Sequence, residues 1–522
     1  MRKIRNGLLI MSSLAVLASF GPALAQDAPT VDTTNGTIQG MASQYNDAVL
    51  VFKGIRYGGD TGGANRFLPP QPVEPWEGVQ EATDYGARCY GLGYPPILMQ
   101  EEGVDLDQTP MSEDCLFLNV WTPGLDDGKR PVMVWFHGGG FTSGSGGSIR
   151  YDGTNLASKK DVVLVTVNHR LASLGFMDVS ALGGEEYADS GNAGMLDIVQ
   201  SLEWVRDNIA AFGGDPENVT VFGESGGGSK VTTLMSMPAA DGLFHRVIAQ
   251  SGINLAAIPA ETAQETAASA MEAVGADSFD ALLEADPEEL TNAPGNWGPV
   301  ATPSLPRNPF VPDADPNGAD IPLMIGSNLN EANFFNATPT EPVDEEGLRA
   351  AFAEGNFTRG IPEENIDELM DAYRGFFPDL EDHKVFQVLA SDAWMTGLVQ
   401  NVANLRAAAD APAWVYHFAM DQGARDGNIG VPHSSEIAYA FDNLDLSKAL
   451  VGEPDEADRA LAEQVSTAWT NFARNGDPNG EGLPEWPAWT EDNKAVMVFD
   501  EDTMLVVDPF SDRLAALAAA RE

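Results

Sequence analysis

The sequence G-E-S-G-G at residues 223–227 constrains the fold more than any other feature, because it follows directly on a run of β-branched and aromatic residues. Residues 218–222 predict a short buried strand, and residues 229–237 carry apolar side chains at roughly helical spacing. A serine held between a strand and a helix needs neighbours without a Cβ, since only then can the backbone turn sharply enough to project its hydroxyl. Ser225 is therefore a candidate nucleophile, although G-x-S-x-G alone could arise by chance in a chain with 53 glycines.

A second glycine cluster, H-G-G-G at residues 137–140, ends the apolar run at 131–136. Such glycines leave backbone N–H groups unshielded, and Gly139 and Gly140 are candidate donors to a negatively charged oxygen. The N–H group of Gly226, at the start of the helix after Ser225, is a third candidate donor. Alone, the cluster could be a phosphate loop or a flexible turn, but it lacks the G-K-[ST] ending and the G-x-G-x-x-G spacing of nucleotide sites.

One of the six histidines stands apart from any structural pattern. His433 follows a Gly-x-Pro loop without periodicity, and functional side chains are often displayed on such loops. The other histidines lie in the glycine motif, in patterned strand or helix segments, or in an acidic run. His433 is thus the candidate general base, with a loop histidine satisfied by Glu436 as the alternative. Among 78 acidic residues, no carboxylate can be singled out in this way.

The two glycine motifs stand within a longer collinear pattern. Its further pieces are F-K-G-I-R-Y (52–57), S-E-D-C-L-F-L-N (112–119), N-H-R-L-A-S-L-G-F (168–176), G-N-A-G-M-L-D (191–197), W-V-R-D-N-I-A-A-F-G-G-D-P (204–216), Q-S-G (250–252) and N-F-A-R-N-G-D-P-N (471–479). In order and spacing this set resembles the type-B carboxylesterase family, which also contains the cholinesterases. The resemblance extends over nearly the whole chain after its first residues.

The resemblance implies a catalytic triad in the chain order serine, acid and histidine. It implies that Glu331, in the loop after the apolar residues 321–325, is the acid and that His433 is the base. Ester hydrolysis would then proceed through an acyl-enzyme on Ser225, with the three glycine N–H groups around the oxyanion. A lipase, an amidase or a lactonase would use the same residues, whereas a non-catalytic adhesion protein of this fold would be expected to lose the serine or the histidine.

Several residues beside the implied triad are singled out by the same resemblance. The family most often has alanine where this chain has Gly226, so we expect a slightly larger acyl side of the site. Glu224 matches a family residue that is hydrogen-bonded near the triad, although it could equally cap the following helix. Ser251, in the Q-S-G segment, resembles a residue that supports the triad rather than a second nucleophile. Glu436, close to His433 in the chain, is a further candidate for such support.

Length alone would allow two or three domains, but the motifs argue for one. They span most of the chain and must converge at a single site, so residues 26–522 are expected to form one α/β-hydrolase domain. Its mixed, mostly parallel sheet would carry helices on both faces. Residues 258–294 and 341–373 are interpreted as helical surface insertions that form the rim of a substrate gorge.

Residues 1–25 predict a cleavable secretory signal peptide. Three basic residues precede an apolar run, and A-L-A at 23–25 supplies a small-residue cleavage site. An uncleaved membrane anchor would need about 20 apolar residues, and this run is shorter. We expect the product to begin near Gln26 and to be periplasmic or secreted.

Cys89 and Cys115 are the two cysteines of the chain, and export to an oxidising compartment permits them to pair. The matching cysteines of the family form a disulfide, which would stabilise this chain by roughly 3 kcal/mol in the chain-entropy model. Cholinesterases place a tryptophan inside this loop to stack on the quaternary ammonium, and residues 90–114 contain none. An uncharged short-chain or aromatic ester is therefore the expected substrate, rather than a choline ester.

The formal net charge of -49 excludes nucleic acid as a partner, because phosphate would be repelled. It is typical of a soluble secreted surface, and it also suggests the hypothesis that the protein is adapted to saline surroundings, where salt screens self-repulsion. The sequence contains neither clustered cysteine and histidine ligands nor an acidic calcium loop, so we expect no metal and no cofactor.

Overall fold

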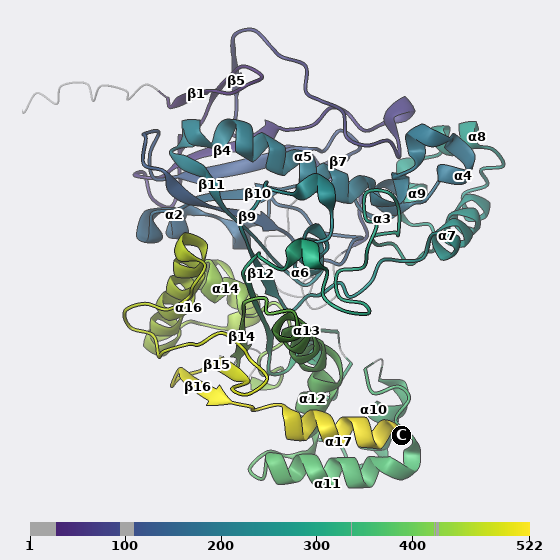
Figure 1. The fold of residues 1–522 in the computed structure, drawn as a ribbon, viewed down its shortest axis with the longest axis vertical. Helices are drawn as coiled ribbons and strands as arrows, with labels where there is room; N and C mark the ends of the chain where they lie inside the picture. The colour runs from purple at the N-terminus through teal and green to yellow at the C-terminus, as the bar shows by residue number, and fades with distance from the viewer. Residues whose placement is uncertain (1–27, 94–108, 336, 356, 422, 424–426) are drawn as a thin grey trace, which may run out of the picture.

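A large twisted sheet runs through the computed structural model, which describes residues 28–93, 109–335, 337–355, 357–421, 423 and 427–522 (Figure 1). The spatial order of its strands is β16-β15-β14-β13-β12-β11-β9-β10-β8-β4-β3. The strands are β3 (Met41–Ala42), β4 (Leu50–Arg56), β8 (Phe117–Thr122), β9 (Arg130–Phe136), β10 (Val163–Val167), β11 (Gly214–Glu224), β12 (Arg246–Gln250), β13 (Leu323–Asn328), β14 (Ala413–Phe418), β15 (Ala495–Phe499) and β16 (Met504–Val507). The predicted signal peptide lies outside the described residues.

The centre of the sheet is parallel and its edges are antiparallel. Every pairing from β10 through β9, β11, β12, β13 and β14 to β15 is parallel. At one edge β8, β4 and β3 are added antiparallel, and at the other edge β16 pairs antiparallel with β15. The predicted mixed, mostly parallel sheet is therefore confirmed, and the carboxyl ends of its parallel strands meet at one edge.

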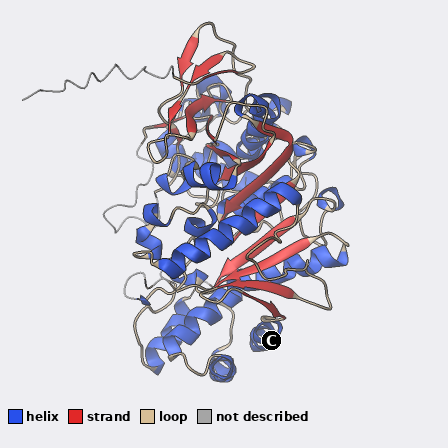
Figure 2. Ribbon diagram, turned by 90° about the vertical axis from the view of Figure 1, so that its left-hand side faces the viewer, coloured by secondary structure: helices blue, strands red, loops and turns tan. Residues whose placement is uncertain are grey.

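Both faces of the sheet are buried, as the near-continuous apolar sequence of its parallel strands requires. Val132, Val134 and Phe136 of β9 belong to one apolar cluster, while Met133 and Trp135 belong to a second. The first cluster contains side chains of α5 (Ala193–Asn208), α6 (Gly226–Leu234) and α13 (Gly397–Ala408). The second contains those of α2 (Thr154–Lys160), α14 (Ile437–Ala440) and α16 (Glu456–Asn475). Figure 2 shows helices on either side of the strands.

The expected insertions are both helical. Residues 258–294 form α7 (Ala260–Ala273), α8 (Phe279–Glu284) and α9 (Pro287–Thr291), and Ser173 Oγ of α3 (Ala172–Phe176) donates to the Leu290 carbonyl at 2.6 Å. Residues 341–373 form α10 (Glu345–Glu354) and most of α11 (Ile366–Phe376). These two pack with α12 (Asp382–Ser391) and the C-terminal α17 (Ser511–Arg521) in a third apolar cluster, seen at the lower end of Figure 1.

The remaining elements are short. One small sheet contains β1 (Thr30–Asp32), β2 (Thr37–Gln39) and β5 (Val79–Glu81), and another contains β6 (Arg88–Cys89) and β7 (Met111–Ser112). In the described part of the chain, the α-helices not yet named are α4 (Ser180–Gly183) and α15 (Lys448–Val451). Cys89 and Cys115 form the predicted disulfide, with their Cα atoms 5.0 Å apart. None of the helices in the described part of the chain combines the length and apolar character that crossing a bilayer requires.

Candidate active site

Ser225 occupies the sharp turn that the glycine motif predicts. It lies between the last residue of β11 and the first of α6, with φ 57° and ψ -121°, a conformation that costs of order 1–3 kcal/mol for a residue with a Cβ. The helix thus begins three residues before the expected start at residue 229. The flanking glycines are required sterically, since a Cβ at Gly223 would lie 2.5 Å from the Phe136 carbonyl oxygen.

The turn opens into a cavity of about 480 Å³, a size typical of small-molecule sites. Ser225 and His433 both line it, and so do Gly139 and Gly140 of the upstream glycine loop. The other lining residues are Leu92, Gly93, Gly138, Thr142, Ser143, Gly144, Ser145, Ser148, Arg150, Tyr151, Glu224, Phe334, Phe335 and Ser434. The structure therefore brings together residues that are more than 200 positions apart in the chain, as the motifs predicted.

The glycine loop packs directly against the start of α6. Gly139 and Gly140 have φ of 86° and 62°, a left-handed conformation that glycine adopts without strain. A Cβ at Gly226 would lie 2.5 Å from both the carbonyl carbon and the Cα of Gly140. This contact brings the three predicted N–H donors into one region. It also corrects one expectation: the space beside Gly226 is filled by the loop backbone, so the glycine does not enlarge the acyl side of the site.

His433 is hydrogen-bonded to Glu331 in a buried pair. The imidazole Nδ1 lies 2.5 Å from Glu331 Oε2, and the second carboxylate oxygen of Glu331 accepts from the Asn328 backbone N–H at 2.7 Å. Neither side chain is more than 1% exposed. Burial lowers the pKa of His433, but the carboxylates of Glu224 and Glu331 more than offset this and raise it to about 9.

The other ring nitrogen of His433 faces a second carboxylate. Nε2 lies 3.0 Å from Glu224 Oε1, which also accepts from Ser434 Oγ at 2.7 Å. Among the described residues no hydrogen bond joins the Ser225 hydroxyl to the imidazole. The Glu224 side chain does not cap α6, so the capping interpretation is wrong. Burial raises the pKa of Glu224, and the neighbouring His433 counteracts this shift.

Two further predicted residues lie behind this pair. Glu436 is fully buried and accepts from Asn328 Nδ2 at 2.6 Å and from Gln250 Nε2 at 3.3 Å. Burial and the nearby carboxylates of Glu224 and Glu331 raise the pKa of Glu436 to about 8. Ser251 follows β12 with φ 46°, and its buried hydroxyl has no hydrogen-bond partner among the described residues. Its supporting role stays a prediction.

Aromatic rings surround His433, and sequence reasoning did not single them out. The ring centroids of Phe334, Phe335 and Trp394 lie 5.4, 5.5 and 5.4 Å from that of the imidazole. Phe357, from the insertion at 341–373, stacks on Trp394 at 4.5 Å. The F-F pair directly after Glu331 is a signal that could have been noticed. Trp394 could not have been found in this way, because it lies in a π-helix, Asp392–Thr396, between α12 and α13.

The described residues contain no group of three or more histidine, cysteine, aspartate or glutamate side chains placed to hold a metal ion.

Comparison with known proteins identifies the family. The model of the carboxylesterase family matches residues 27–515. The chain belongs to the carboxylesterase family. Para-nitrobenzyl esterase of Bacillus subtilis is 32% identical over 500 residues, which cover 92% of this carboxylesterase and 97% of the relative. Liver carboxylesterase of Sus scrofa is 32% identical over 532 residues, covering 93% and 91% of the two chains.

Solved structures of bacterial carboxylesterases share the whole fold. A carboxylesterase of Geobacillus stearothermophilus has a TM-score of 0.78 at 36% identity and covers 94% of this chain and 99% of its own. An esterase of Clostridium hathewayi that can hydrolyse aliphatic aromatic polyesters has a TM-score of 0.79 at 34% identity, covering 95% and 98%. The predicted family and α/β-hydrolase fold are confirmed, and the protein is a carboxylic ester hydrolase.

Proposed function

We propose that this carboxylesterase hydrolyses uncharged esters through an acyl-enzyme on Ser225, with His433 as general base and Glu331 as the acid of the triad. The observation that carries the proposal is the 2.5 Å contact between His433 Nδ1 and the buried Glu331 carboxylate, on a ring that lines the same cavity as Ser225. A carboxylate at Nδ1 holds the imidazole in the tautomer whose Nε2 lone pair can accept a proton.

Each step follows from the chemistry of these groups. Nε2 of His433 takes the hydroxyl proton as Ser225 Oγ forms a bond to the ester carbonyl carbon, and Glu331 stabilises the imidazolium. The N–H groups of Gly139, Gly140 and Gly226 hold the oxyanion. When the tetrahedral intermediate collapses, Nε2–H protonates the leaving alcohol. Water then repeats the sequence on the acyl-enzyme and releases the acid.

The ring lies between two carboxylates, and Nε2 lies 3.0 Å from Glu224 Oε1 without a hydrogen-bond partner among the described residues. For catalysis, Nε2 must form a hydrogen bond with the Ser225 hydroxyl. We assign Glu224 to the stabilisation of the imidazolium and Glu436, whose pKa near 8 leaves it protonated at neutral pH, to the support of that carboxylate cluster. Ser251 is assigned to the backbone frame of the elbow, since a Cβ on the neighbouring Gly252 would lie 2.6 Å from the Ser225 carbonyl carbon.

The expected substrate is an ester with a short acyl chain or an aromatic group. Phe334, Phe335 and Trp394 supply apolar faces beside His433, and Phe335 is 43% exposed. Aromatic rings prefer such edge-to-face and offset contacts. The related Clostridium hathewayi esterase acts on aliphatic aromatic polyesters, which is compatible with an aromatic wall of this kind.

We further propose that residues 26–522 form one catalytic domain, released to the periplasm or the medium by cleavage near Ala25. The basic and apolar pattern of residues 1–25 and the small residues before Gln26 support this assignment. Amino-terminal sequencing of the protein exported by a host that secretes it would test the cleavage site.

A panel of p-nitrophenyl esters of increasing acyl length, run on the wild type and on Ser225→Ala, tests the proposed chemistry. We expect a maximum at short acyl chains without activation at a lipid interface, and loss of activity in Ser225→Ala. Activity that survived the substitution would overturn the mechanism. A maximum at long chains with interfacial activation would identify a lipase instead.

A further inference from the structure

A lysine ammonium is completely buried behind the glycine loop. Lys230 lies on α6, five residues after Ser225, and has no exposed surface. Its Nζ donates to the backbone carbonyl of His137 at 2.9 Å. Transfer of an ammonium from water to a protein interior is costly unless it is compensated, so a buried lysine in a helix otherwise packed by Val231 and Leu234 needs an explanation.

Three consecutive carbonyls of the loop accept hydrogen bonds from the protein, and the His137 carbonyl held by Lys230 is the first of them. The Gly138 carbonyl accepts from His137 Nδ1 at 2.8 Å, and the Gly139 carbonyl accepts from the Ser143 N–H at 3.0 Å. In a trans peptide the N–H points opposite to the carbonyl of the same unit. The N–H groups of Gly138, Gly139 and Gly140 are thereby directed away from these partners, and all three residues line the cavity.

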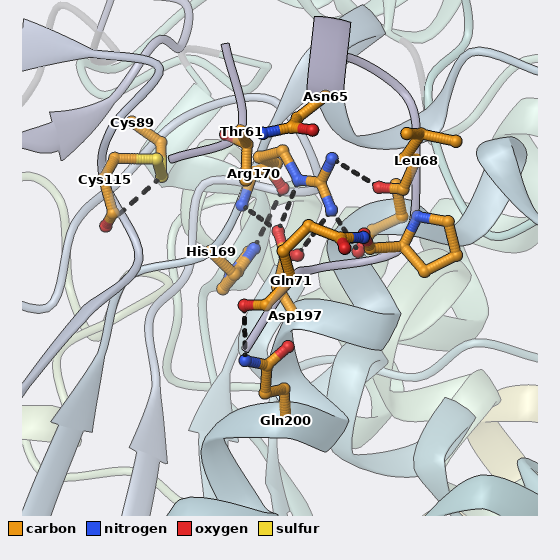
Figure 3. Close-up of polar contacts among 12 residues, drawn as sticks. Thr61, Asn65, Leu68, Gln71, Cys89, Cys115, His169, Arg170, Asp197 and Gln200 are labelled. Carbon is orange, nitrogen blue, oxygen red and sulfur yellow. Dashed lines mark hydrogen bonds and ion pairs between the residues drawn. A yellow bond between two sulfur atoms is a disulfide. The ribbon is translucent and has the colours of Figure 1, made fainter. Parts of the chain in front are cut away.

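The same ammonium acts on the histidine that anchors the second carbonyl. The rings of His137 and His169 are stacked, with centroids 4.8 Å apart and an interplanar angle of 5°. Burial first, and then the charge of Lys230, hold the pKa of both imidazoles well below their usual range. A neutral imidazole carries one proton, and a carbonyl only accepts, so the proton of His137 is on Nδ1. Arg170, the residue after His169, forms a buried two-pronged ion pair with Asp197 (Figure 3).

A carboxylate stands at the edge of the loop that Lys230 anchors. A Cβ at Gly138 would lie 2.9 Å from Glu224 Oε2. The charge of Glu224 raises the pKa of Lys230, while the larger effect of burial lowers it to about 7. At the higher pH at which His433 is neutral, the Lys230 amine is uncharged, and its N–H still donates to the His137 carbonyl.

We propose that Lys230 is a positioning residue for the oxyanion loop: its Nζ donates to the His137 carbonyl and so holds the residue whose imidazole anchors the next carbonyl of the loop. This inference rests on the proposed function, because it assigns the loop to oxyanion binding. Lys230 touches neither the substrate nor the reacting atoms, and acts through the peptide unit that it holds.

The test is Lys230→Met, which keeps the length of the side chain and removes its charge and its hydrogen bond. Since the loss of one oxyanion donor costs about 10²- to 10³-fold, we expect loss of a positioning residue to lower kcat by about 10- to 100-fold with little change in KM. The affinity for a trifluoromethyl ketone, which forms an anionic tetrahedral adduct, should fall by the same factor. The melting temperature should stay equal or rise, because an apolar residue of similar volume replaces a buried charge.

Two variants make the result decisive. Lys230→Gln, which is neutral but can still donate to the His137 carbonyl, should recover part of the lost kcat, and it replaces the methionine variant if that protein does not fold. Lys53→Met is the matched control, because Lys53 is a half-buried lysine of β4 that packs on the ring of Tyr85 and does not line the cavity. It should retain wild-type kcat and inhibitor affinity.

Wild-type kcat and wild-type ketone affinity in the Lys230 variants would overturn the inference. A loss of activity that is fully explained by a fall in melting temperature would also overturn the inference. Ser225→Ala, assayed beside them, separates the two proposals: residual turnover there contradicts the proposed function, whereas an inactive Ser225→Ala with a fully active Lys230→Met contradicts the inference alone.

Discussion

Replacement of Glu224 by glutamine should move the acid limb of the pH–activity profile to lower pH. His433 can accept the Ser225 proton only when its ring is neutral, so kcat/KM rises as pH increases through the pKa of His433, which is raised to about 9. Glutamine keeps an oxygen for Ser434 Oγ but removes the carboxylate charge that raises the pKa of His433 most. The pKa of His433 must then fall.

The expected size follows from the distance between the groups. Even with the screening of bulk water, two unit charges 3.0 Å apart interact by about 1.4 kcal/mol, which corresponds to about one pKa unit. At an effective dielectric constant of about 20, the same pair would shift the pKa by about four units. Because Glu224 and His433 are both nearly inaccessible to water, we expect the acid limb to move down by at least about one pH unit.

The assay is a pH-stat measurement of kcat/KM for phenyl acetate between pH 5 and 10, since this substrate does not ionise. Glu436→Gln is the comparison variant. The charge of Glu436 raises the pKa of His433 by less than the charges of Glu224 and Glu331 do, so this replacement should move the acid limb down by less than Glu224→Gln does. A Glu224→Gln limb that shifted by less than half a pH unit, or to higher pH, would refute the electrostatic reasoning.

Two further predictions concern the frame of the site. Gly226→Ala introduces the residue that is common in the family, but its Cβ would lie 2.5 Å from the Gly140 Cα. Relief of this clash requires the loop to shift by about 1 Å, which should lower kcat about 10²-fold. Gly375→Ala, whose Cβ would meet open space, should leave kcat unchanged in the same assay. Replacing Cys89 and Cys115 by serine opens a loop of 26 residues and should lower the free energy of unfolding by about 3 kcal/mol, measured by urea titration against the wild type; an unchanged midpoint would contradict the chain-entropy account.

The parts of the site that sequence could predict are those where backbone geometry dictates the residue. The tight turn at Ser225, with its positive φ, tolerates few neighbours other than glycine, and the left-handed Gly139 and Gly140 follow the same rule. The strand expected at 218–222 is contained in β11, but the helix boundary was displaced because α6 starts directly at the turn. The continuous apolar run at residues 131–136 likewise fits the burial of β9 on both faces of the sheet.

Other parts depend on contacts that periodicity does not encode. Glu331 is one carboxylate among 78 acidic residues, and its role depends on β13 lying beside β14 so that the loop after it reaches His433. Lys230 is a charged residue in a short helix and would ordinarily be assigned to the surface. Trp394 reaches the imidazole through a π-helical turn, which shifts the side chain off the ordinary helical register. Such features become visible only in three dimensions.

The central claim, that Ser225, His433 and Glu331 act as one unit, is tested most directly by covalent trapping. The enzyme would be treated with diethyl p-nitrophenyl phosphate and the modified residue located by peptide mass spectrometry, in the wild type and in His433→Ala. We predict one diethylphosphoryl group per chain, on the peptide that contains Ser225, and labelling at least about 10²-fold slower without the imidazole. A label on Ser251 or another side chain, or equally fast labelling of His433→Ala, would contradict the account.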